Sequence, residues 1–349
     1  MARKGKGRRQ PKAQQHDFGV ADFIFPGERA SYWGGVAGVA AVYLLLAAIS
    51  YGVFRDSEGN KLWYVPVAVL AWPLLAILIC NLLASRDRVQ QLRRLGRQAK
   101  VAANNHPELH RALLRQAGLL GLSTPPDVYV VSDEQPVVYC LPSGPGTIII
   151  SQALRERLST EEVEALLARE LTHIRSRHVR LELAMVFIRN SHPVLKIIFL
   201  PVLLMMLFAR SWIDLIEFTA DRGALLLTLR PAVVNSAIVK HAVISDPNAG
   251  ITQEELEAFI RSSADIQTDA AQLERHFRVG QFISSQPNLR ERIEALTAFP
   301  HSPQGQQAVA RMARLQGVSP ASIALVKPGQ PGEIVQVEED ELGDTIPEP

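Results

Sequence analysis

The chain has 349 residues, enough for one large domain or two smaller ones, and 47% of them are hydrophobic. Its 37 basic and 35 acidic side chains give a net charge of +2, so no whole-chain field indicates a nucleic-acid-binding protein. The two cysteines, Cys80 and Cys140, lie far apart in sequence. That excludes a disulfide framework or a cysteine zinc site and fits a reducing compartment.

The N-terminus is basic and poor in apolar residues. This composition predicts a disordered basic arm over residues 1–31. The arm suits either nucleic-acid binding or the flank of a membrane segment, and we favour the flank and expect no nucleic-acid partner. A cleavable signal peptide is excluded, because the next apolar run starts late and has no small-residue cleavage site after it. The basic residues are Arg3, Lys4, Lys6, Arg8, Arg9 and Lys12.

Two uncharged apolar runs follow, Trp33–Phe54 and Trp63–Ala84. Each is long enough to cross about 30 Å of hydrocarbon as a helix. Buried core helices are the alternative, but the short polar loop between the runs favours a transmembrane hairpin over residues 32–85. Basic residues flank both outer ends. We therefore expect an integral protein of the inner or cell membrane, in contact with the lipid bilayer, with its N-terminus and main domain cytoplasmic.

Residues 86–300 are expected to form the main domain. A basic helical pattern over 86–122 precedes three short β-like runs at 127–131, 137–141 and 147–150. Proline and glycine separate these runs, which predicts a small antiparallel sheet. Ser159 and Glu162 then form a capping-box signature before a stretch of helical periodicity, so a helix with one buried face should begin there.

From residue 194 to about residue 299 the chain is mostly helical in pattern. The run Val194–Phe208 is interrupted by Lys196 and Pro201, and we favour a buried or membrane-apposed helix there over a crossing. Helical patterns continue to about residue 299, with a strong one at 252–263. Residues 301–349 are rich in Gln, Pro and Gly and end in acidic residues, which predicts a solvated polar-to-acidic tail.

A zinc-protease motif with one altered position lies on the helix after Ser159. The HExxH motif places two zinc-binding histidines four residues apart on one helix face, with a Glu between them that activates water. Glu170 and His173 stand at the motif's second and last positions, but Arg169 takes the first. Arginine stays protonated and has no lone pair for a metal.

A later helical segment carries the other carboxylates that such a site needs. Glu217 is suitably placed downstream to be a third ligand, and Asp221 follows four residues later on the same face. A di-metal carboxylate site would need a second Glu-x-x-His motif, and we find none. A serine hydrolase is poorly supported, because no G-x-S-x-G elbow surrounds Ser143.

Together these pieces resemble the HtpX-like and CAAX-prenyl-protease-type zinc metallopeptidases, which are gluzincins. The resemblance covers roughly residues 100–298 and follows a membrane hairpin, as in that family. It rests on the segments Thr147–Leu154, Leu158–Leu167, His173–His178, Glu217–Arg222 and Gln286–Ile293.

The resemblance implies an α+β protein, with a transmembrane hairpin followed by a mainly helical gluzincin-type domain and a small edge sheet. It implies zinc as the cofactor, His173 and Glu217 as metal ligands, Glu170 as the catalytic base and Asp221 as a carboxylate that orients the site. An edge strand would pair with an extended substrate; its residues are Thr147, Ile148, Ile149 and Ile150.

Four positions depart from the family pattern. Arg169 replaces the first ligand, Thr172 stands where a glycine is usual, and Val137-Val138 stand where the family often has Asn-Ala. A dication about 4 Å from a guanidinium would be repelled by about 8 kcal/mol at an effective dielectric of 20. We therefore hypothesise that an Arg169–Glu217 ion pair joins the two helices in place of zinc.

Another histidine could still restore a metal site. The candidates are His178, His192, His241 and His276. On a continuous helix His178 would point about 140° away from His173, which is an awkward angle for a shared ligand.

Three functions remain open. The chain is a polypeptide-binding pseudoprotease whose client is a peptide or a membrane protein, or it is an active zinc metalloendopeptidase that cleaves membrane or damaged proteins at an irregular site. In the third, it is a membrane scaffold that binds through its basic arm and acidic tail. The sequence favours the first, because Arg169 replaces a ligand.

Overall fold

The computed structural model describes residues 18–55, 64–95, 100–141, 144–179, 210–245, 289–319, 323–326 and 334–336, and singly 192, 194, 196 and 208. The N-terminal half contains η1 (Val20–Asp22), α1 (Glu28–Arg55), α2 (Tyr64–Leu95), α3 (Pro107–Leu119), β1 (Asp127–Val131), β2 (Val138–Leu141), β3 (Thr147–Ser151), α4 (Gln152–Arg157) and α5 (Thr160–Ser176). The remainder contains α9 (Arg210–Thr228), α10 (Pro231–Ser245), α13 (Leu289–Ala298), η3 (Phe299–His301), α14 (Pro303–Gln316), β4 (Ala324–Val326) and β5 (Ile334–Gln336).

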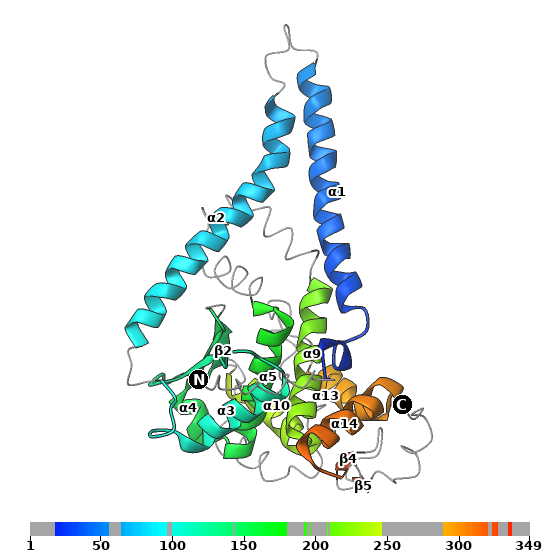
Figure 1. Ribbon diagram of the computed structural model, residues 1–349. Coiled ribbons are helices and arrows are strands. Elements are labelled where there is room, and N and C mark those ends of the chain that lie inside the picture. The colour runs from blue at the N-terminus through cyan, green and yellow to red at the C-terminus, as the bar shows by residue number, and fades with distance from the viewer. Residues whose placement is uncertain are drawn as a thin grey trace, which may run out of the picture.

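Helices α1 and α2 form a hairpin that projects from a mainly helical body (Figure 1). The stretches Glu28–Val53 and Tyr64–Leu83 are long and apolar enough to cross a membrane. Their side chains are largely outside the core, and Leu44 and Leu74 are 60% and 72% exposed. Water disfavours so much exposed apolar surface, so the pair fits a membrane hairpin, as predicted. Helix α2 continues to Leu95, beyond the apolar stretch.

The three-stranded sheet has the order β1-β3-β2 and is mixed. Strand β3 pairs in parallel with β1 and antiparallel with β2. The prediction of an antiparallel sheet is therefore wrong for β1. The prediction that Thr147–Ile150 form an edge strand is also wrong, because β3 is central, buried throughout, and bonded on both sides. A strand without free backbone groups cannot accept a substrate by strand addition.

Two predicted boundaries are corrected by burial. The basic arm cannot extend to residue 31, because Phe18 and Phe23 are in the core and α1 already begins at Glu28. The tail cannot start at residue 301, because α14 buries Met312 and Ala313 completely. The predicted helix at 252–263, most of the run 194–209 and the acidic end lie outside the described residues.

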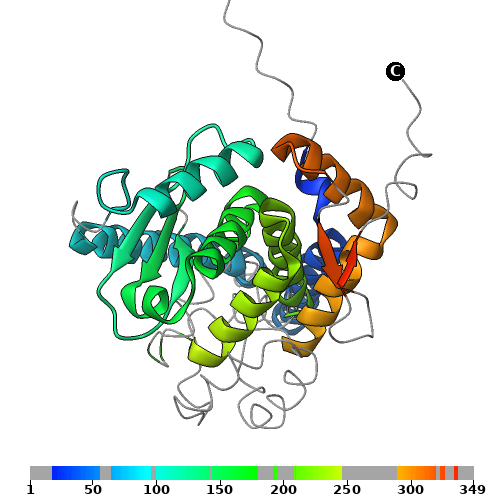
Figure 2. The same cartoon turned by 90° about the horizontal axis from the view of Figure 1, so that it is seen from below.

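The core of the body is the crossing of α5 with α9, which Figure 2 shows from below. The predicted capping box is formed, with Ser159 Oγ accepting from the Glu162 amide and Glu162 accepting from the Ser159 amide. The crossing is close because Gly223 of α9 faces Thr172. A Cβ on Gly223 would collide with the Thr172 side chain, so the bulk at position 172 is accommodated by glycine on the partner helix.

Candidate functional site

A buried arginine occupies the first position of the motif. Arg169, on α5, is 6% exposed. Its guanidinium donates to Glu170 Oε1 over 2.7 Å and, across the helix crossing, to Glu217 Oε2. Its Nε lies 3.4 Å from Asp221 Oδ1. The hypothesised Arg169–Glu217 ion pair is thus present, and it belongs to a larger group of charges.

A second arginine, Arg292 of α13, completes that group. Its Nε and Nη2 donate to the two carboxylate oxygens of Asp221 over 2.8 and 2.7 Å, and its Nη1 lies 3.7 Å from Glu217 Oε2. Arg292 lies in the segment Gln286–Ile293 that resembles the family, but no local pattern in the sequence marks it as a member of the site. Arg169, Glu170, Glu217, Asp221 and Arg292 are hereafter the charged cluster; all are at most 6% exposed and they join α5, α9 and α13.

The cluster sets the ionisation of its own members. Burial alone would raise the pKa of Glu217, but Arg169 and Arg292 more than offset it and lower that pKa to about 2. Burial raises the pKa of Glu170, and only part of this rise is cancelled by Arg169 and by a hydrogen bond from Cys140. Burial, reinforced by Arg169, lowers the pKa of His173 well below its ordinary value, so the imidazole is neutral.

His173 lies between the charged cluster and a second histidine. Its Nε2 is 3.8 Å from Glu217 Oε1, and its Nδ1 is 3.2 Å from Nδ1 of His178. The prediction that His178 points away is wrong. Helix α5 ends at Ser176, and Arg177 takes a left-handed conformation, φ 63°, that folds His178 back onto His173.

The residues present do not fit a zinc ion. Zinc needs three protein ligands with a fourth position open to water. Here His173 and Glu217 are the two donors, and the guanidinium of Arg169 bonds the carboxylate that a metal would take. Among the described residues no group of three or more His, Cys, Asp or Glu side chains is arranged to hold a metal. The side chains instead satisfy one another.

Strand β2 brings a sheet edge to the charged cluster. In the described part of the chain β2 pairs with β3 alone, and it contacts α5. Cys140 of β2 hydrogen-bonds to Glu170. Because the Ser151 amide donates to the Val137 carbonyl, alternation of the antiparallel ladder turns the backbone groups of Val138 and Cys140 away from β3. The sheet edge beside the motif is therefore β2, not β3.

The other candidate histidines are not brought together as ligands. His241 of α10 is partly buried; burial together with the charges of Arg169 and Arg292 lowers its pKa to about 3. That electrostatic coupling places it near the cluster, but among the described residues no hydrogen bond or ion pair joins it to His173 or Glu217. His192 accepts a hydrogen bond from the Val194 amide. His276 lies outside the described residues.

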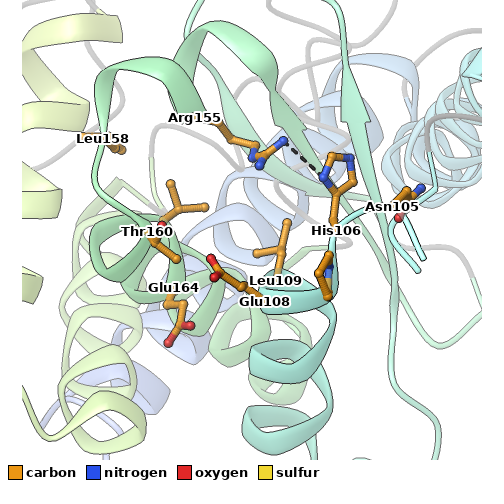
Figure 3. A pocket seen from close by; sticks show the side chains of 10 residues that line it. Asn105, His106, Glu108, Leu109, Arg155, Leu158, Thr160 and Glu164 are labelled. Carbon is orange, nitrogen blue, oxygen red and sulfur yellow. Dashed lines mark hydrogen bonds between the residues drawn. The ribbon is translucent and has the colours of Figure 1, made fainter. Parts of the chain in front are cut away.

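A separate pocket lies elsewhere, at the starts of α3 and α5 (Figure 3). His106 and Arg155 face each other across it, with Arg155 Nη1 3.4 Å from His106 Nδ1, and Glu108 and Glu164 also line it. It contains no residue of the charged cluster. Its charged side chains are of both signs, and Glu164 pairs with Arg115 over 3.0 Å, so the pocket suggests no defined ligand.

Comparisons with known proteins agree with the resemblance found in the sequence. The model of peptidase family M48 matches residues 103–299. Plastoglobule-localized metallopeptidase 48 (chloroplastic) of Arabidopsis thaliana is 31% identical over 166 residues, which are 45% of this chain and 46% of that protein. A Protease HtpX homolog of Moorella thermoacetica is 30% identical over 170 residues, covering 40% and 56%. Another, of Lactiplantibacillus plantarum, is 25% identical over 146 residues, covering 41% and 47%.

The chain spans about half the length of the curated relatives it matches. No solved structure matches it.

Proposed function

The chain belongs to peptidase family M48, since the family model matches more than half of it, and we propose that it is a membrane-anchored pseudoprotease that binds polypeptide without cleaving it. Family members are in general zinc metallopeptidases, and the relatives named above are a metallopeptidase and two proteases. In this proposal the protein has the fold of the family but does not carry out its metal-dependent peptide hydrolysis.

The observation that carries the proposal is the position of the Arg169 guanidinium. It bonds to Glu170 and Glu217 at once, so the base and one ligand of a working site are both engaged. A dication there would meet a fixed positive charge in a buried place, where repulsion is poorly screened. With the guanidinium in the metal's place, Glu170 would accept a hydrogen bond from Arg169 instead of activating water.

The proposed binding surface is the edge of β2. A bound segment would add a strand along Val138–Leu141, using the backbone groups that face away from β3. Tyr139 is 39% exposed and would offer an aromatic contact at this edge. We further propose that this edge faces the cytoplasm, because basic residues flank the outer ends of both apolar runs.

Metal content separates the pseudoprotease from an active enzyme. The protein is purified in detergent, and zinc is measured by elemental analysis beside an Arg169→His variant. We expect no zinc in the native chain and near-stoichiometric zinc in the variant, which restores the missing donor. Zinc in the native chain together with chelator-sensitive proteolysis would instead favour the active metalloendopeptidase, and His178 and His192 would then be tested as ligands.

Peptide binding at β2 is tested by one backbone substitution. Cys140→Pro removes an amide that faces the proposed segment, whereas Cys140→Ala keeps it. With fluorescent extended peptides as probes, we expect affinity to fall by about tenfold in the proline variant and to be nearly unchanged in the alanine variant. Equal binding by both variants would rule out strand addition at this edge. The scaffold function predicts instead that deleting residues 1–31 or residues 330–349 abolishes function, whereas substitutions beside the motif do not.

A further inference from the structure

The segment Phe18–Glu28 leads into the first apolar helix. It is held against the helical body by side-chain contacts. Asp22 forms an ion pair with Arg311 of α14 over 2.7 Å, and Gln304 donates to the Ala21 carbonyl over 3.0 Å. Next to it, the Arg222 guanidinium lies between the rings of Phe25 and Phe299, 4.3 and 4.4 Å from their centroids. The base of the hairpin thus has a defined place on the body.

Glu28 is the buried acidic residue of this segment. It lies in the first turn of α1, yet it is only 6% exposed. Its carboxylate accepts from Thr219 Oγ1 of α9 and lies 3.1 Å from Nε2 of His178. The Phe25 amide also donates to Thr219 Oγ1 over 2.9 Å. A buried carboxylate that loses such partners is costly, so Glu28 holds α1 against α9 and His178.

A continuous hydrogen-bonded path therefore runs from α1 to the motif. Glu28 contacts His178, His178 contacts His173, and His173 faces Glu217 of the charged cluster. Each imidazole has one nitrogen toward its neighbour on either side, so its ring orientation depends on both. Trp212 of α9 packs edge-on against His178, with ring centroids 6.0 Å apart, and encloses the path.

The contact between α1 and α9 continues along α1, away from the cluster. Ser31 Oγ and Ser211 Oγ are 2.7 Å apart, and Tyr32 packs against Trp212 with centroids 5.5 Å apart. Further along α1, Gly38 lies close to Phe208, which precedes α9 in the chain, and a Cβ on Gly38 would lie 2.8 Å from the Phe208 ring. Since α1 touches α9 at successive levels, its lower end cannot shift without disturbing the partners of Glu28.

We propose that Glu28 is a positioning residue that couples the first membrane helix to His173 through His178, so that displacement of α1 loosens the charged cluster. The hairpin then anchors the protein in the membrane, and its position also influences the packing of the charged cluster. The coupling does not depend on whether the cluster holds zinc or a polypeptide lies beside it, so its test is independent of the proposed function.

Hydrogen exchange on the full-length protein in lipid nanodiscs tests the coupling. In Glu28→Gln, a change that preserves side-chain shape, we expect the amides of residues 169–178, from the last turns of α5 through His178, to exchange about tenfold faster, while those of α3 are unchanged. Asp22→Asn is the matched control. It weakens an ion pair of the same segment that has no link to His178, so the α5 amides should not change.

A disulfide between positions 31 and 211 gives the decisive second measurement. The paired oxygens of Ser31 and Ser211 are close enough for Ser31→Cys and Ser211→Cys to bond. In the Glu28→Gln background, oxidation should pin α1 to α9 and restore slow exchange at residues 169–178, and reduction should reverse this. Unchanged exchange in Glu28→Gln would overturn the proposal. So would fast exchange that persists after oxidation, because Glu28 would then act only locally.

Discussion

In a soluble protein apolar side chains are usually buried and charged side chains exposed. The hairpin and the helical body each depart from this arrangement, in different ways. The hairpin exposes large apolar residues, such as Leu44 and Leu74, whereas the body buries the five residues of the charged cluster. The hairpin's arrangement is stable only in a medium that accepts apolar surface, so its partner is outside the chain. The charges of the body find their partners within the chain, on three helices. The stability of the hairpin thus depends on the surrounding membrane, whereas the stability of the charged cluster depends on contacts between its own side chains.

The largest expected effect on stability comes from removing a carboxylate of the charged cluster. Glu217→Ala leaves Arg169 buried without its carboxylate on α9 and weakens the contact with Arg292. We expect the free energy of unfolding to fall by about 3–5 kcal/mol. Chemical denaturation in detergent measures this. A variant as stable as the native chain would show that the ion pair does not hold α5 to α9.

A charge introduced into the hairpin tests whether its exposed apolar surface lies in a membrane. Leu74 is 72% exposed and lies within the second apolar stretch. Leu74→Asp should cost about 3 kcal/mol of apparent membrane insertion, because an aspartate near the bilayer centre is poorly solvated. A translocon insertion assay measures the inserted fraction, with Leu74→Ala as the control. Normal insertion of the aspartate variant would argue against a membrane location for α2.

The close contact at the α5–α9 crossing gives the next largest effect. Gly223→Ala places a methyl group against Thr172, whose Cβ would be 2.8 Å away. We expect a loss of about 2–3 kcal/mol in the free energy of unfolding. The double variant Thr172→Gly with Gly223→Ala should recover part of that loss, since it moves the methyl-sized volume to the other helix. No recovery would mean that the strain lies elsewhere.

The pH dependence of stability tests whether the buried charges of Arg169 and Arg292 act on a nearby histidine. Burial, with Arg169 and Arg292, lowers the pKa of His241 from 6.5 to about 3. Between these values the unfolded chain binds a proton that the folded chain does not, so the contribution to stability is full above pH 6.5 and declines as the pH falls toward 3.

His241→Gln should remove that decline. Comparing unfolding free energies at about pH 7.5 and about pH 5, we expect the native chain to lose about 1–2 kcal/mol more than the variant, a figure reduced because His241 is partly exposed. Parallel pH profiles for the two proteins would show that His241 does not feel the cluster.

The smallest effect comes from an ion pair at the surface. Arg230 and Glu161 are 2.6 Å apart, but their side chains are 55% and 57% exposed. Arg230→Gln should change the free energy of unfolding by at most about 0.5 kcal/mol, because water and salt screen the pair. A loss comparable to that of Glu217→Ala would contradict the distinction between buried and exposed charges drawn above.

Local patterns were sufficient for the elements that carry the motif. The capping box at Ser159 and Glu162, the helix after it and the two apolar runs were all predictable, because each signal is local in sequence and has a strong physical cause. The ion pair of Arg169 with Glu217 was also predictable. A buried guanidinium on one helix needs a carboxylate, and the resemblance placed Glu217 opposite it.

Pairing between distant segments was not predictable. A parallel β1–β3 pair requires a chain crossover that strand patterns do not reveal, and so the central strand was mistaken for an edge. The polar residues after position 301 gave little sign of a core helix, because α14 buries mainly small side chains such as Ala308 and Ala313.

The sequence by itself determined the membrane hairpin, the family and the loss of a metal donor at position 169, because each depends on residue type and local spacing. Only the tertiary structure decided which side chains surround Arg169 and His173. Arg292 joins from α13, and a left-handed Arg177 turns His178 onto His173 and toward Glu28. These contacts join residues far apart in the chain, and their geometry follows from how the helices pack rather than from any one of them.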